Sequence, residues 1–159
     1  KGKHVPDIVI AGGLTLEDHV FKALALGAPF VKAVGMARAN MCAAMVGKTI
    51  GNAIKEENIP QSLSKYGKSI DEIFITSSQL KRKFGKRFEQ LPPSAIGVYT
   101  YFARLAQGLR QFMAGERKFA LEYITRDDIV ALTREAAEIS GIDYVMDADK
   151  KEVDKILGK

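Results

Sequence analysis

Two short apolar runs, each followed by a glycine turn, place the strongest constraint on the fold of this chain. The first run is Ile8–Ile10, with Gly12 and Gly13 after it, and the second is Ala28–Val34, with Gly35 after it. The residues between the runs carry apolar side chains at helical spacing. A strand, a helix and a strand in this order predict one right-handed crossover between two parallel strands.

Capping residues predict the boundaries of this unit. Thr15 and Asp18 have the spacing of a capping box, which predicts the start of the helix. Gly27 stands where a left-handed C-cap is expected. Because the run Ile8–Ile10 is wholly apolar, the sequence predicts a strand that is buried on both faces.

The two turns predict a binding site for a phosphate group. The carboxyl ends of neighbouring parallel strands lie at one edge of a sheet, so the main-chain N–H groups of both turns are expected side by side. Glycine lets a ligand oxygen approach the main chain, and arginine binds phosphate bidentately. The candidate binding residues are Gly12, Gly13, Gly35, Met36, Ala37 and Arg38. An isolated Gly-Gly pair is also typical of a tight turn, and Arg38 is equally compatible with a solvated first turn of a helix.

Parts of the chain resemble a known class of enzymes. The stretches Ile10–Gly13 and Lys22–Ala28 resemble the seventh and eighth strands of the FMN-dependent (β/α)8 oxidoreductases, which include glutamate synthase, hydroxyacid oxidases and inosine monophosphate dehydrogenase. The stretches Pro92–Phe102, Leu105–Gly115 and Tyr123–Asp128 resemble the helical tail that follows the barrel in the archaeal-type, FMN-binding glutamate synthase domain.

The resemblance implies an α/β fold, the C-terminal fragment of a (β/α)8 barrel, with the last two βα units in residues 1–60 and a mostly helical extension in residues 61–159. It implies FMN as the cofactor. The groups implied to hold the FMN phosphate are the main-chain donors at Gly12, Gly13, Gly35, Met36 and Ala37, together with Arg38. Several related barrels have glycine where this chain has Ala37. The implied reaction reduces the 2-iminoglutarate formed from 2-oxoglutarate and ammonia to glutamate, and oxidation of a 2-hydroxyacid is the alternative within the class.

The length of the chain predicts a fragment. A (β/α)8 barrel needs about 250 residues, whereas this chain has 159 residues and begins Lys1-Gly2-Lys3-His4, as if at a cleavage point or an expression boundary. Two parallel strands with open edges need other strands or chains to pair with those edges. We expect this partner to be the remainder of the barrel, or a second copy of this chain in a homo-oligomer or swapped dimer. The reacting groups of such barrels come from several strand ends. No catalytic residue can therefore be named, and the fragment alone is expected to be inactive.

The composition is typical of a globular, cytoplasmic chain. Hydrophobic residues make up 47% and charged residues 27% of the sequence, which is enough apolar material for a core. No window has the ~18 uninterrupted apolar residues of a membrane span. The first residues also do not form a cationic and apolar leader.

The single cysteine, Cys42, excludes an internal disulfide and fits a reducing compartment. Bacterial glutamate synthases hold an iron–sulfur cluster with several cysteines just beyond the eighth strand, and one cysteine cannot hold such a cluster. The apolar residues around Cys42 predict a packed thiol instead. The resemblance then implies that electrons arrive from a ferredoxin-like segment or an electron-donor subunit. His4 and His19 lack the companions of a zinc site, so no metal site is predicted.

A basic segment suggests a second class of function. The net charge is +5, and the segment Lys81–Phe88 combines cations with aromatic residues, as nucleic-acid-binding or interaction modules do. Leu80, Phe84 and Phe88 have helical spacing, which predicts that they face inward. We therefore favour a solvated basic surface over nucleic-acid binding.

Most of the remaining chain is predicted to be helical. The predicted helices are Asn40–Lys55, Ser69–Phe84, Ala95–Met113, Arg126–Ser140 and Lys150–Leu157. Capping boxes are predicted at Ser69 with Glu72, Thr125 with Asp128 and Asp149 with Glu152, and C-caps at Gly85, Gly115, Gly141 and Gly158. A stripe with helical spacing predicts a packing face, made of Val98, Phe102, Leu105, Leu109 and Phe112. The sequence Gly47-Lys48-Thr49 lacks the first glycine of a nucleotide-binding loop and falls inside a predicted helix.

Overall fold

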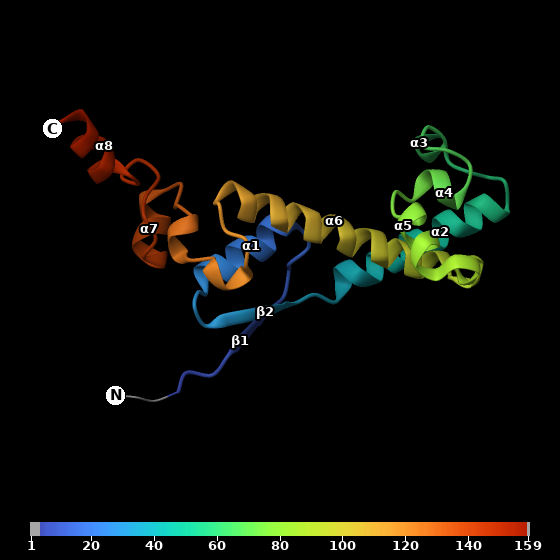
Figure 1. The fold of residues 1–159 in the computed structure, drawn as a ribbon, viewed down its shortest axis with the longest axis horizontal. Coiled ribbons are helices and arrows are strands. Elements are labelled where there is room, and N and C mark those ends of the chain that lie inside the picture. The colour runs from blue at the N-terminus through green and yellow to red at the C-terminus, as the bar shows by residue number, and fades with distance from the viewer. Residues whose placement is uncertain (1–3, 159) are drawn as a thin grey trace. The chain divides into compact units, whose positions relative to one another are not determined.

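The computed structural model describes residues 4–158, which form mainly helices and one small sheet of two parallel strands. Figure 1 shows these elements along the chain. In order they are β1 (Ile8–Ala11), α1 (Glu17–Leu26), β2 (Val31–Gly35), α2 (Arg38–Lys55), α3 (Gln61–Ser64), α4 (Ile70–Ile73), α5 (Ser77–Phe84), α6 (Pro93–Gly115), α7 (Arg134–Ser140) and α8 (Lys150–Leu157). Short 3-10 helices are η1 (Gly85–Gln90), η2 (Leu121–Tyr123) and η3 (Arg126–Asp128). Residues 1–3, where the sequence suggests a cleavage or expression boundary, lie outside the described residues.

The two strands pair in parallel, and α1 joins them, which confirms the predicted order of strand, helix and strand. Val9 pairs with Ala33, and Ala11 pairs with Gly35 at the carboxyl end of the sheet. β2 begins at Val31 rather than at Ala28 because the preceding residues form a turn.

Gly27 does not adopt the left-handed conformation that was predicted for it. A Cβ atom at this position would lie only 2.1 Å from Cγ2 of Val31. Glycine is therefore required at the end of α1 by close packing against the first residue of β2, and not by a C-cap.

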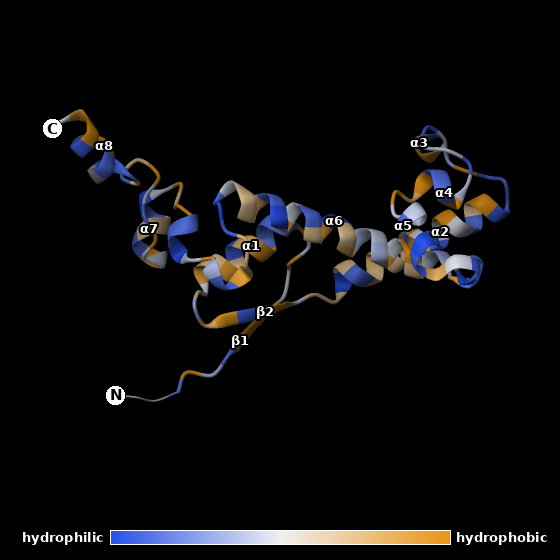
Figure 2. Ribbon diagram, viewed as in Figure 1, coloured by the Kyte–Doolittle hydropathy of each residue, from blue (hydrophilic) through white to orange (hydrophobic). Residues whose placement is uncertain are grey.

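Most of β1 is open to solvent, so the prediction that this strand is buried on both faces is wrong for the described residues by themselves. Ile8 is 43% exposed and Val9 is 62% exposed. Figure 2 shows that much of both strands is nevertheless hydrophobic. Parallel strands of this composition are normally covered on both faces. β1 therefore has the composition of a buried strand, but the described residues leave most of it exposed.

The described chain divides into two compact units, each assembled from separate segments. The first unit contains residues 4–11, 18–35 and 109–158, and the second contains residues 12–17 and 36–108. The Gly12–Gly13 turn thus belongs to the same unit as α2 and the N-terminal part of α6. The boundary after residue 60 that the sequence suggests stays a prediction.

The core of the first unit forms around α1. Val20, Phe21 and Leu24 are buried on one face of this helix. The ring of Phe21 stacks on that of Phe112, with 5.5 Å between the centroids.

An ion pair fixes the segment that follows α6 in the first unit. Lys118 Nζ lies 2.6 Å from Oδ1 of Asp128, and only 6% of the Asp128 side chain is exposed. The same carboxylate accepts the main-chain N–H of Thr125 at 2.8 Å, so the predicted capping box of Thr125 and Asp128 is confirmed.

This capping box does not start the predicted helix Arg126–Ser140. The first half of that prediction is wrong, because the α-helix covers only Arg134–Ser140. The capping box starts only the short η3, and the chain is extended at Ile129. α7 begins later because Thr133 caps it, with Oγ1 accepting the N–H of Ala136 at 3.1 Å.

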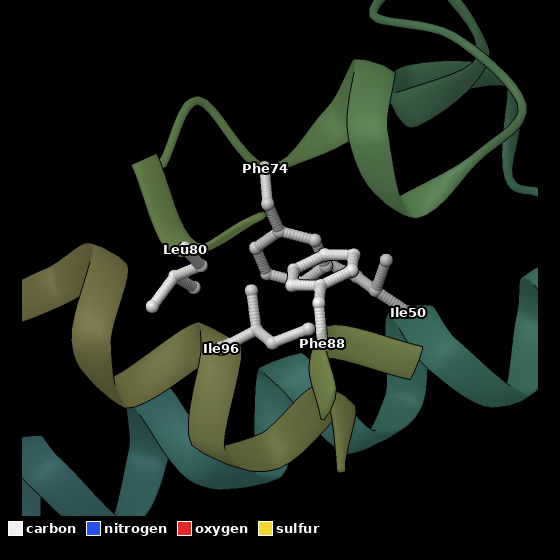
Figure 3. Close-up of a cluster of buried hydrophobic side chains, with 5 residues drawn as sticks. All are labelled: Ile50, Phe74, Leu80, Phe88 and Ile96. Atoms are coloured by element: carbon white, nitrogen blue, oxygen red, sulfur yellow. The ribbon is translucent and has the colours of Figure 1, made fainter. Parts of the chain in front are cut away.

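The second unit has a separate core between α2, α5, η1 and α6. Figure 3 shows the two phenylalanine rings packed against the aliphatic side chains. The five buried members are Ile50, Phe74, Leu80, Phe88 and Ile96. Leu80 and Phe88 thus face inward as predicted, whereas Phe84 is 38% exposed.

The predicted helix Ser69–Phe84 is divided into α4 and α5. Between these helices the chain is extended at Phe74. The side chain of Phe74 is buried in the core of the second unit. The capping box of Ser69 and Glu72 is confirmed. Hydrogen bonds from the N–H of Lys68 and from Ser69 lower the pKa of the Glu72 carboxyl.

The predicted helix ends are confirmed in part. Gly141 and Gly158 are left-handed C-caps, with φ values of 68° and 67°. Gly115 is wrong as a cap, because α6 includes it and Arg117 takes the left-handed conformation instead. Asp149 occupies the N-cap position of α8, but the predicted capping box is wrong, because its φ is 59° and its side chain makes no cap hydrogen bond.

Glycines allow α2 and α6 to approach closely in the second unit. A Cβ at Gly47 would lie 2.5 Å from the carbonyl oxygen of Pro93, and one at Gly97 would lie 2.6 Å from that of Ala43. The glycine of the Gly47-Lys48-Thr49 sequence is thus a helix-packing residue.

The predicted packing stripe on α6 is only partly correct. Phe102 and Phe112 are 41% and 42% exposed, whereas Gly97 and Gly108 are buried. Gly97 and Gly108 each lie one position before a member of the predicted stripe, Val98 and Leu109. Part of the closely packed face of α6 is therefore made of small residues.

Candidate phosphate site

The turn after β1 has the conformation that its glycines were predicted to allow. Gly12 has a φ of 118° and Gly13 a φ of 67°, which side chains other than glycine rarely adopt. A Cβ at either position would meet none of the described atoms within 4 Å. The main chain of this turn is therefore both restricted to glycine and open to a ligand.

The second turn leads from β2 into α2. Gly35 is the last residue of β2, and a Cβ there would lie 3.1 Å from Cβ of its pairing partner Ala11. Met36 and Ala37 follow, and α2 begins at Arg38, two residues earlier than predicted. The two turns thus start at paired residues of the sheet.

The N-terminus of α2 has no side-chain cap from its own N-cap residue. Ala37 occupies the N-cap position without a side-chain hydrogen bond, and the first turn contains no acidic residue. N–H groups in the first turn of a helix have no intrahelical acceptor and carry the positive end of the helix dipole. This helix end is therefore suited to an anion.

Arg38 adds a second positive charge at the same helix end. Its side chain is exposed, and it forms no ion pair with an acidic residue in the described part of the chain. A cation at a helix N-terminus is electrostatically unfavourable unless an anion is present. Arg38 is therefore available to a ligand.

Asn40 and Tyr101 hold the two turns, and sequence reasoning missed both. Nδ2 of Asn40 donates to the carbonyl oxygen of Met36 at 2.7 Å. The Tyr101 hydroxyl donates to the carbonyl oxygen of Thr15 at 2.6 Å and lies 3.9 Å from Sδ of Met36. Tyr101 could have been found in the sequence because it lies at helical spacing between two glycines, Gly97 and Gly108, which indicates a closely packed face of α6.

The predicted site residues are divided between the two units. Those within the second unit are Gly12, Gly13, Met36, Ala37 and Arg38. Gly35 belongs to the first unit and is joined to Met36 by the chain. The part in the second unit offers main-chain donors and a guanidinium, which bind an anion but supply no general acid or base at neutral pH.

Other candidate sites are weaker. Cys42 is exposed, so the prediction of a packed thiol is wrong. Within residues 4–158, no group of three or more His, Cys, Asp or Glu side chains is arranged to hold a metal ion. A cleft of about 430 Å³ in the first unit has Lys32 and Glu122 at its wall among mostly apolar residues.

Two lysines of the basic segment lie over its own aromatic rings. Lys81 Nζ lies 5.4 Å from the centroid of Phe88 and forms an ion pair with Asp71. Lys83 Nζ lies 5.6 Å from the centroid of Phe84. Phe88 is also buried in the core of the second unit, so its ring is poorly placed to stack on bases.

Comparisons of the chain with known protein families, with curated proteins and with solved structures found no match. Among the helices of the described residues, none combines the length and the apolar character that crossing a membrane requires.

Proposed function

We propose that this chain is the C-terminal part of an FMN-dependent, glutamate synthase-like oxidoreductase, and that its second unit contributes the corner that binds the FMN phosphate. The observation that carries the proposal is the N-terminus of α2, which has no side-chain cap and carries Arg38, a side chain without an ion pair among the described residues. The turn with positive φ at Gly12 and Gly13 lies in the same unit and supports it.

The residues fit a phosphate dianion. Main-chain N–H groups at Gly12, Gly13 and the start of α2 are donors without a competing carboxylate among them. The guanidinium of Arg38 matches phosphate oxygens bidentately. Ala37 has a Cβ where several related barrels have glycine. Its N–H is still proposed to donate to the phosphate, but the Cβ prevents the phosphate from approaching the main chain as closely as glycine would allow.

The chemistry follows from the resemblance and not from the site itself. FMN, when bound, supplies the electrons that reduce 2-iminoglutarate to glutamate. The residues of this chain bind and orient the phosphate end of the cofactor. Acid, base and substrate-binding groups would come from other strands, so the chain alone is proposed to be inactive.

The proposed partner is the remainder of the barrel. The exposed apolar residues of β1, such as Ile8 and Val9, support a cover over both faces of the sheet. A homo-oligomer or swapped dimer is the alternative cover for the chain by itself. An electron-donor subunit or ferredoxin-like segment completes the proposed enzyme. The phosphate corner suits a 2-hydroxyacid oxidase of the same class equally well.

The proposal is tested by titrating the chain with FMN and with riboflavin, which lacks the phosphate, at low ionic strength and following flavin fluorescence. Because the described residues form a sheet of two strands, which offers little wall for the ring system, we expect weak FMN binding, with a Kd on the order of 1 mM. Riboflavin should bind at least tenfold more weakly, roughly the contribution of one charge-assisted hydrogen bond. Equal binding of the two flavins, or binding of neither, would contradict the proposal.

A further inference from the structure

Tyr101 connects both turns of the proposed phosphate corner to α6. Its hydroxyl donates to the carbonyl oxygen of Thr15, which follows the Gly12–Gly13 turn, at 2.6 Å. The same oxygen lies 3.9 Å from Sδ of Met36, the first residue after β2. One side chain from a distant helix thus contacts both turns.

A second contact holds the first turn along the same helix. A Cβ at Gly108 would lie 2.6 Å from Cγ of Glu17, so this glycine makes room for the glutamate side chain. Tyr101 and Gly108 are seven residues apart, which places them on one face of α6. The segment from Gly12 to Glu17 is therefore held at two points two helical turns apart.

The environment of the Tyr101 hydroxyl keeps it a donor. Burial, and in second place the negative charge of Glu17, raise the pKa of the Tyr101 phenol. The hydroxyl therefore stays protonated at neutral pH and well above it. Its proton is committed to the Thr15 carbonyl, which has the shorter distance of its two neighbours.

We propose that Tyr101 is a positioning residue of the phosphate corner, which fixes the path of the Gly12–Gly13 turn relative to the start of α2 so that the main-chain donors of both turns converge on one phosphate. This inference rests on the proposed function. It assigns α6, which follows the two βα units in the chain, an indirect part in cofactor binding, through the position of the two turns.

The Tyr101→Phe variant tests the inference, because it removes the hydroxyl and keeps the ring. We expect FMN affinity to fall by about two- to tenfold, the range that one neutral hydrogen bond supports, while the affinity for riboflavin is unchanged. Amide hydrogen exchange at residues 12–16 should become faster. Tyr99→Phe is the matched control, since Tyr99 packs against the core of the second unit and its hydroxyl has no hydrogen-bond partner in the described chain.

The outcomes separate this inference from the function on which it rests. If the unmodified chain prefers FMN and Tyr101→Phe binds it equally well, the role of Tyr101 is refuted and the phosphate corner stands. If the unmodified chain has no preference for FMN, both fail. A loss of FMN affinity that Tyr99→Phe reproduces would assign the effect to general loosening of α6, and would also refute the role of Tyr101.

Discussion

We expect the Gly97→Ala variant to be less stable than the unmodified chain by about 1–3 kcal/mol, the cost typical of overpacking. The added methyl group would lie 2.6 Å from the carbonyl oxygen of Ala43 and 3.0 Å from Cα of Gly47. Both are main-chain atoms, so α2 and α6 must move apart as a whole. Urea unfolding followed by circular dichroism at the helix band measures the change.

Gly115→Ala is the matched control in the same helix. A Cβ at Gly115 would meet no described atom within 4 Å, and its φ is not positive. Alanine is a better helix former than glycine, so this variant should be as stable as the unmodified chain or more stable by up to about 1 kcal/mol. Equal stability of the Gly97→Ala variant and the unmodified chain would show that the two helices do not approach as closely as described.

The Arg38→Ala variant should lose FMN binding by about tenfold or more. A hydrogen bond to a charged group contributes about 1.5–3 kcal/mol, which corresponds to this range of affinity. Riboflavin binding should not change, because the guanidinium is proposed to contact only the phosphate. The measurement is the same flavin titration, made at low ionic strength because salt screens exposed charges.

Two further variants separate specific contact from net charge. Arg82→Ala makes the same change in charge on the exposed surface of α5, and it should leave FMN affinity unaltered. Arg38→Lys keeps the charge but not the planar fork, so it should restore only part of the affinity. An equal effect of Arg82→Ala and Arg38→Ala would reduce the role of Arg38 to general electrostatic attraction.

Sequence reasoning succeeded where the signal is local. The strand, helix and strand around α1, the positive φ at Gly12 and Gly13, and the bounds of α8 all depend on residues close in the chain. Two of the four predicted capping boxes, those at Ser69 and Thr125, are confirmed for the same reason. The box at Asp149 is not formed, because its backbone is left-handed and its side chain makes no cap hydrogen bond.

The wrong predictions are those in which packing between distant segments determines the local structure. The break at Phe74 depends on burial against Ile50 and Ile96, which no local pattern reveals. On α6, large apolar residues suggested the packing face, but Gly97 and Gly108 make the closest approaches. The role of Tyr101 depends on a carbonyl oxygen 86 residues away and was therefore missed.

The most direct test of the phosphate corner is a map of amide chemical shifts of the chain in the presence of FMN, riboflavin and inorganic phosphate. We expect saturable shifts with FMN and phosphate, but not with riboflavin, at the amides of Gly12, Gly13, Met36, Ala37 and Arg38. The amide of Gly85, on the surface after α5, should not move. Unchanged amides at the two turns in saturating FMN, or equal shifts with riboflavin, would contradict the proposed phosphate corner.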